Sequence, residues 1–109
     1  LGDYAWVGDD AVLYTLGEIT IGANSVVSQK CYLCTGSHDF MSQHFDITAS
    51  PIVIGEKCWL ATDVFVAPGV SVGDGTVVGA RSSVFKSLPA NKICRGNPAV
   101  VIRERVETD

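Results

Sequence analysis

Aliphatic residues recur at every sixth position along much of the chain. The clearest series has six members at a constant step: Ile54, Leu60, Val66, Val72, Val78 and Val84. An earlier series has the same step and contains one slip of two residues: Leu1, Val7, Leu13, Ile21, Val27 and Leu33. Repetition at a fixed short period is typical of a solenoid, in which each repeat stacks on its neighbour.

A period of six residues does not fit an α-helix, because 3.6 residues per turn would rotate successive hits by about 240°. Strand alternation tolerates the period, but six glycines directly follow these aliphatic residues and would interrupt a long strand. The pattern therefore predicts a short strand and a turn in each hexapeptide, with the aliphatic side chain pointing inward. Three such units make a triangular coil of about 18 residues, stacked at about 4.8 Å by parallel strand pairing.

The repeat predicts an all-β parallel β-helix of four coils in one domain, residues 1–109. The predicted coils are residues 1–20, 21–38, 54–71 and 72–89. Residues 39–53 interrupt the repeat, and we expect a protruding loop there, since a long excursion between regular coils is more often functional than accidental. After Pro89 the hexapeptides end, and we expect residues 90–109 to form a short helix or tail that covers the last coil.

Charge is distributed unevenly along this chain of 109 residues, which has a formal net charge of −4. Residues 1–80 hold two basic and nine acidic side chains, whereas residues 81–109 hold six basic and three acidic ones. The reversal indicates an anionic partner near the C-terminal end, and the acidic whole favours a small phosphorylated ligand over nucleic acid. We expect no membrane span, because no apolar run approaches the roughly 18 residues that cross a bilayer.

Four cysteines are present: Cys31, Cys34, Cys58 and Cys94. The first two have CxxC spacing, but no second pair and no histidine pair completes a zinc site, so no metal is expected. Cys31 and Cys58 occupy the fifth place of the hexapeptide, where small residues predominate, and we interpret them as packing residues. Cys34 falls at a turn position, and its role stays open. Since no export signal is apparent, free thiols in a reducing cytoplasm are expected.

The tandem pattern aliphatic-Gly-x-x-small-x resembles the hexapeptide-repeat acyltransferases, whose fold is a left-handed parallel β-helix. The similarity is greatest to the colanic-acid-biosynthesis O-acetyltransferases and covers nearly the whole chain. The segments that carry it are LYTLGEITIG, CYLCTGSHD, PIVIG, CWLATDVFVAPGVSVGDG, VVGARSSVFKSLP and GNPAVVIR. The resemblance implies acetyl-CoA as co-substrate, a sugar or polysaccharide-precursor hydroxyl as acceptor, and a homotrimer with active sites between subunits.

The resemblance also implies roles for three residues near the reaction site. His38, before the predicted loop, matches the general base of the family, and a neutral imidazole is suited to take the acceptor's proton in a direct attack. Trp59 matches a tryptophan that borders the acetyl and acceptor pocket, with packing between coils as the alternative. Thr15 stands where related chains have an acceptor-binding asparagine. His44 lies within the loop, and we expect it to matter much less.

Four further residues match cofactor-binding positions of the family. Ala61 and Ala80 lie where the pantetheine arm runs along the backbone and where a larger side chain would block it. Lys86 and Arg103 match basic residues that contact the phosphates of coenzyme A, although solvated surface charge is the alternative for each. Val100 departs from the family pattern, which often has a basic residue there.

The sequence leaves two alternative functions open. The nearest enzymatic alternative is an N-acetyltransferase that acts on a nucleotide-linked amino sugar. The other is a non-catalytic β-helix for binding or scaffolding. A metalloenzyme resembling the γ-class carbonic anhydrases would need three histidine ligands, whereas this chain has two histidines.

Overall fold

Residues 1–106 are described by a computed structural model, and within them fifteen strands and no helix are present. In chain order the strands are β1 (Trp6–Val7), β2 (Val12–Tyr14), β3 (Ile19–Ile21), β4 (Val26–Val27), β5 (Tyr32–Cys34), β6 (Gly36–His38), β7 (Ile47–Ala49), β8 (Ile52–Ile54), β9 (Trp59–Leu60), β10 (Phe65–Val66), β11 (Ser71–Val72), β12 (Val77–Val78), β13 (Ser83–Val84), β14 (Lys92–Gly96) and β15 (Ala99–Glu104). The described residues contain no helix long and apolar enough to cross a membrane.

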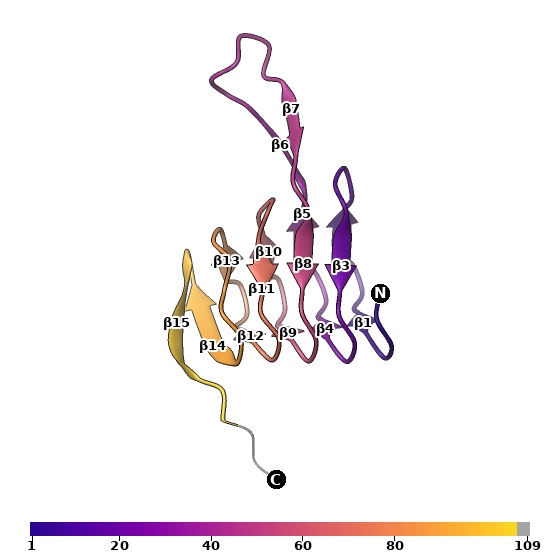
Figure 1. Cartoon of the computed structure of the whole chain (residues 1–109), viewed down its shortest axis with the longest axis vertical. Helices are drawn as coiled ribbons and strands as arrows, with labels where there is room; N and C mark the ends of the chain where they lie inside the picture. Colours follow the sequence, from indigo (N-terminus) through magenta and orange to yellow (C-terminus); the bar gives the residue numbers. More distant parts are fainter. Residues whose placement is uncertain (107–109) are drawn as a thin grey trace.

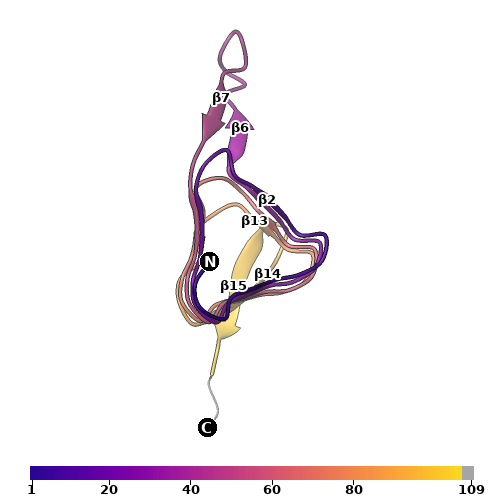
Figure 2. The ribbon, with the colours of Figure 1, turned by 90° about the vertical axis from the view of Figure 1, so that its right-hand side faces the viewer.

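Three stacks of parallel strands form the walls of a triangular prism, seen along its axis in Figure 2. Wall A contains β1, β4, β9, β12 and β14, wall B contains β2, β5, β10 and β13, and wall C contains β3, β8 and β11. The sixth-position residues stack in register, as Leu33, Val66 and Val84 do in wall B. The parallel β-helix predicted from the hexapeptide period is therefore confirmed.

The prism interior is built from two kinds of inward-facing residue. Sixth-position side chains such as Leu60 and Val78 are fully buried and supply its apolar content. Residues at the fifth place of the hexapeptide form hydrogen bonds to the neighbouring coil. Ser25 Oγ, for example, donates to the Gly55 carbonyl at 2.6 Å. Cys31 Sγ likewise donates to a carbonyl of the next coil, at 3.1 Å. A small residue with a hydroxyl or thiol thus fills the corner and satisfies a turn carbonyl at the same time.

The interpretation of Cys31 and Cys58 as inward-facing packing residues is confirmed, because both side chains are buried. Burial raises the pKa of both thiols above the ordinary cysteine value, since the thiolate would lose its hydration. The thiolate is the nucleophilic form, so these two positions are unsuited to covalent catalysis. Cys34 is half-buried, and its Sγ donates to the Gly36 carbonyl at 3.1 Å.

The interruption of the repeat has different bounds from the predicted loop 39–53. Antiparallel strands β6 and β7 pair from Gly36↔Ala49 to His38↔Ile47, so the protrusion is a hairpin, residues 36–49, which we call the arm. It projects sideways from the prism, across the stacking direction (Figures 1 and 2). Strand β8 already lies in wall C between β3 and β11, because buried Ile52 and Ile54 fill that wall's inner column. The second coil is thus closed by β8.

The helix considered for the C-terminal segment 90–109 is wrong. Strand β14 extends wall A, where Ile93 and Cys94 pair with β12, and β15 folds back on it in antiparallel fashion. Cys94 is fully buried, so this segment supplies the apolar cover that the last coil needs. A strand forms because the open edge of β12 offers unpaired backbone groups that a helix would leave unsatisfied. The last three positions of that prediction, 107–109, lie outside the described residues.

Candidate functional site

His38 ends strand β6 in the arm, and its ring is held by one hydrogen bond. Its Nδ1 lies 2.9 Å from the carbonyl oxygen of Phe45. Because a carbonyl can only accept, Nδ1 carries the proton and donates it. In the neutral ring Nε2 is then the nitrogen with the free lone pair. This tautomer is the one that a general base requires, and it presents Nε2 on the side of the ring away from Phe45.

A compact loop at the tip of the arm, residues 39–46, holds the Phe45 carbonyl in place. The backbone N–H of Phe45 donates to the Ser42 carbonyl at 3.3 Å. The Ser42 hydroxyl in turn accepts from the backbone N–H of Asp46 at 3.4 Å. Phe45 has a φ of 49°, in the left-handed region that a residue of this size rarely adopts. Ser42 therefore stabilises the strained turn that aims a carbonyl at His38.

Asp39 follows His38 directly, but its side chain serves the loop instead of the imidazole. Its Oδ1 accepts a hydrogen bond from the backbone N–H of Met41 at 3.0 Å. His44 is exposed, and its backbone N–H donates to Ser42 Oγ at 3.3 Å. Of the two histidines, His38 is the one whose ring has a fixed partner within the described residues.

A hollow of about 280 Å³ lies against His38, at the edge between walls B and C. Its lining consists of Tyr14, Leu16, Tyr32, Gly36, Ser37, His38 and Ile47. Thr15 is exposed and does not line it, although both of its chain neighbours do. The two tyrosines of this lining were not among the residues predicted from the sequence. Strand alternation could have found them, because Tyr14 and Tyr32 adjoin the inward-facing Leu13 and Leu33.

A second hollow of about 500 Å³ lies along the edge between walls A and B, where the turns of successive coils stack. Its lining consists of Ser28, Gln29, Trp59, Ala61, Thr62, Val77, Gly79 and Ala80. Three of the predicted residues, Trp59, Ala61 and Ala80, thus lie together. Trp59 is half-exposed and its Nε1 donates to Ser28 Oγ at 2.9 Å, so its ring lies outside the prism instead of packing between coils.

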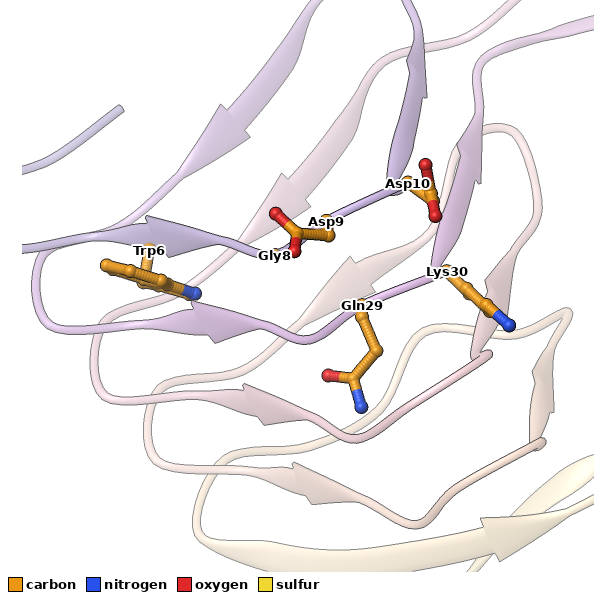
Figure 3. Close-up of a pocket in the computed structure, with 6 residues that line it drawn as sticks. All are labelled: Trp6, Gly8, Asp9, Asp10, Gln29 and Lys30. Carbon is orange, nitrogen blue, oxygen red and sulfur yellow. The ribbon is translucent and has the colours of Figure 1, made fainter.

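The same edge is also hollowed over the first two coils. A space of about 340 Å³ there is lined by Trp6, Gly8, Asp9, Asp10, Gln29 and Lys30. Figure 3 draws these residues. Gln29 lines both hollows of this edge. The edge between walls A and B is therefore concave along most of the prism, and none of the residues that line its N-terminal half was predicted as a site residue.

The predicted phosphate-contacting residues lie toward the C-terminal end of the prism, and both are exposed. In wall A the residues Trp59, Val77, Ile93 and Arg103 are register partners on successive strands. Arg103 is thus three strand spacings, about 14 Å, from Trp59 along the wall. Lys86 follows β13 on the last coil. Neither lines any of these three hollows.

Residues 1–106 contain no group of three or more His, Cys, Asp and Glu side chains that could hold a metal ion. All four cysteines are free. The candidate site therefore consists of one imidazole with a fixed tautomer, a hollow beside it, and a separate concave edge on the same prism.

Comparison with known proteins agrees with the geometry. The family described as bacterial transferase hexapeptide (six repeats) matches residues 51–86. Over 109 residues the chain is 86% identical to the colanic acid biosynthesis acetyltransferase WcaF of Escherichia coli K12, covering 100% of this chain and 60% of that protein. The chain belongs to the hexapeptide-repeat transferases. The resemblance inferred from the sequence motifs is confirmed.

Solved structures of other hexapeptide-repeat proteins share the fold. A maltose O-acetyltransferase from Clostridium difficile 630 superposes with a TM-score of 0.92 at 29% identity, covering 97% of this chain and 58% of that one. An acetyltransferase from Vibrio cholerae, VCA0836 complexed with acetyl coenzyme A, gives 0.87 at 25% identity, covering 98% and 71%. The left-handed parallel β-helix is thereby confirmed. The hexapeptide-repeat chain spans 60% of the length of WcaF.

Proposed function

We propose that this chain carries the catalytic β-helix of an acetyl-CoA-dependent O-acetyltransferase that acts on a hydroxyl of a sugar or polysaccharide precursor. One observation carries the proposal: Nδ1 of His38 donates to the Phe45 carbonyl, so Nε2 is free to accept a proton beside a hollow. The name of the relative WcaF and the acetyl coenzyme A complex of VCA0836 support the acetyl donor and the biosynthetic setting.

In the proposed reaction His38 acts as general base and then as general acid. Nε2 takes the proton of the acceptor hydroxyl while the oxygen of that hydroxyl forms a bond to the carbonyl carbon of the thioester. The carbon–sulfur bond then breaks, and the proton passes from Nε2 to the sulfur, which leaves as the CoA thiol. The Phe45 carbonyl stabilises the imidazolium that forms between these steps, because it accepts from Nδ1. No acyl-enzyme is required.

We further propose that the acetyl donor lies along the edge between walls A and B. Ala61 and Ala80 leave the backbone of that edge accessible, and Trp59 borders the hollow there. The phosphates would extend toward Lys86 and Arg103, in the part of the chain where basic residues outnumber acidic ones. Exposed cations favour phosphate binding, and salt weakens such contacts.

Homotrimerisation is part of the proposal, because a single chain keeps the two halves of the site apart. His38 lies at the edge between walls B and C, whereas Trp59 and its hollow lie at the edge between walls A and B. A second copy would supply the missing half. Trp6 is 64% and Trp59 50% exposed, an aromatic surface that a neighbouring copy would cover.

We place the protein in the cytoplasm, since its four cysteines are free.

The proposal is tested by following release of the CoA thiol from acetyl-CoA in the presence of a panel of sugars. We expect sugar-dependent release by the parent chain and formation of an acetyl ester that mild alkali cleaves. Product stable to mild alkali would indicate an amide and an amino-sugar acceptor. Tight acetyl-CoA binding without transfer to any sugar would contradict the enzymatic proposal.

A further inference from the structure

The indole of Trp59 is held in one place on the outer face of wall A. Trp59 on β9 is the register partner of Val26 on β4, and Ser28 lies two residues further along the same coil as Val26. The backbone N–H of Ser28 donates to the Leu60 carbonyl at 2.9 Å, which fixes its distance from β9. The Ser28 hydroxyl accepts from Nε1 of Trp59 at 2.9 Å. The indole therefore lies diagonally across the wall, from its own coil toward the preceding one.

This hydrogen bond decides on which side of its strand the indole lies. In wall A, β9 has β4 on one side and β12 on the other, and Trp59 is the register partner of both Val26 and Val77. The bond to Ser28 draws the ring toward β4, so Val77 on the opposite side keeps a surface that lines the hollow of this edge. Because Nε1–H is the only donor of an indole, loss of the Ser28 hydroxyl would release the ring from this orientation.

The residues that line this hollow are ordered along the stacking direction. Ser28 and Gln29 come from the second coil, Trp59 and Ala61 from the coil of β9, and Ala80 from the coil of β12. On the proposed function, the phosphates of the acyl donor extend toward the C-terminal end of the prism. The thioester then lies at the opposite end of the hollow, beside the indole.

The surface beyond the indole does not suit an apolar chain. Gln29 lines both hollows of this edge, and the hollow on the N-terminal side is also lined by Asp9, Asp10 and Lys30. An alkyl chain placed there would take water from charged groups without offering them a hydrogen bond in return. An acyl group longer than acetyl thus meets a fixed ring first and charged groups behind it.

We propose that Ser28 is a positioning residue that holds the Trp59 indole as a stop at the acyl end of this hollow, and that this indole stop makes the site select acetyl-CoA over thioesters of longer acids. The inference rests on the proposed function, because it takes this edge as the place of the acyl donor. Trp59 is then a specificity-determining residue. A fixed wall can discriminate by roughly 10–200-fold for each methylene that does not fit.

Donor selectivity with a fixed sugar acceptor tests the indole stop. For the parent, kcat/KM for acetyl-CoA should exceed that for butyryl-CoA, which is two methylenes longer, by about 100-fold. In Ser28→Ala this ratio should fall at least tenfold, because butyryl-CoA is used better. A substitution that only damages the fold lowers the rate with both donors, so a gain with the longer donor separates positioning from a structural role.

Three further variants complete the series. Ser28→Thr keeps the hydroxyl and should hold the donor ratio within threefold of the parent value. Trp59→Phe removes the N–H donor and part of the ring and should lower the ratio at least tenfold, which tests the indole stop even if Ser28→Ala fails to fold. The matched control is Ser71→Ala, which removes an exposed serine of wall C that lines none of the three hollows and should leave the ratio unchanged.

Exchange of the indole N–H with solvent provides a readout that does not depend on activity. The chain has two tryptophans, Trp6 and Trp59, so nitrogen-labelled protein gives two indole signals in a magnetic resonance spectrum, and Trp6→Phe assigns them. Exchange at Trp59 should accelerate at least tenfold in Ser28→Ala and stay near the parent rate in Ser28→Thr. Equal exchange in the parent and in Ser28→Ala would mean that Ser28 does not hold the ring, and would overturn the assignment.

Failure of the indole stop and failure of the proposed function give different results. Equal use of acetyl-CoA and butyryl-CoA by the parent, with sugar-dependent transfer intact, overturns the indole stop and leaves the proposed function standing. The same holds if Ser28→Ala and Trp59→Phe both keep the parent's donor ratio. No transfer from either thioester to any sugar overturns both.

Discussion

His38 and Trp59 lie at different edges of the same prism, although the proposed reaction needs both. His38 belongs to the arm between walls B and C, and Trp59 lines the concave edge between walls A and B. On the proposed function, each chain would offer two half-sites, one of each kind. Two copies placed with unlike edges together would complete one site, and a closed ring of three would complete three.

Mixed assemblies test this sharing of the site. His38→Ala should inactivate one half-site, and Ala61→Trp should inactivate the other by filling the hollow beside Trp59. After joint unfolding and refolding at equal amounts, roughly a quarter of the interfaces would pair two intact halves, because the contact is head-to-tail. We therefore expect CoA release to recover in the mixture.

Each variant refolded alone is the control and should stay inactive. Native mass spectrometry establishes that mixed assemblies are present. If they are present and no activity returns, both halves of the site must come from one chain.

Substitution of Ser42 should reveal how the arm positions His38. Ser42→Ala removes the hydroxyl that accepts from Asp46 N–H and should loosen the strained Phe45 turn. We expect a fall of about tenfold in kcat with little change in either KM, since a positioning effect acts in the transition state. Ser42→Thr keeps the hydroxyl and should restore most of the rate. A lower thermal midpoint with unchanged kcat would indicate a structural role only.

The double charge reversal Lys86→Glu and Arg103→Glu tests the placement of the phosphates. Because such contacts are made equally in the ground and transition states, the KM for acetyl-CoA should rise by about tenfold while kcat changes little. The difference from the parent should shrink as salt is added. Calorimetry at low salt provides the check: equal affinity in the two proteins would make this basic segment ordinary solvated surface.

Arg105 predicts a stability effect that is separate from chemistry. Its guanidinium donates to the carbonyls of Lys57 and Gly75 at 2.8 and 2.9 Å and so ties the terminal hairpin to two successive coils. Arg105→Ala should lower the free energy of unfolding by about 1–2 kcal/mol, as loss of charged hydrogen bonds does. Urea titration followed by tryptophan fluorescence measures it. Val106→Ala, at an exposed neighbouring position, is the control and should change little.

The walls of the prism could be predicted because each inward position depends on a local repeat. Val66 and Val84, for example, could be predicted to stack in one column from their shared position in the hexapeptide alone. The bounds of the arm were harder to predict, because His38 lies at the end of a predicted coil, while strand β8 begins at Ile52, two residues before the hexapeptide series resumes at Ile54. Nothing local to residues 99–104 marks them as a strand either, since their pairing partner is β14, which itself depends on the open edge of β12.

The sequence predicted candidate site residues only where a motif matched the family pattern. His38, Trp59, Ala61 and Ala80 were predicted from the resemblance to the family, and the structure places the last three around one hollow. Tyr14 was missed: strand alternation predicts that its side chain points outward, but its contact with Gly36, one coil further along, could not be predicted from the local sequence.

The central claim is that His38 is the base of an acetyl transfer, and the most direct test compares two single substitutions. His38→Ala should lower sugar-dependent CoA release by about 10²–10⁴-fold, because general-base catalysis contributes on that order. Acetyl-CoA affinity measured by calorimetry should stay unchanged in the same variant. His44→Ala, in the same arm, should keep most of the parent rate. Equal losses in the two variants, or full activity in His38→Ala, would contradict the account.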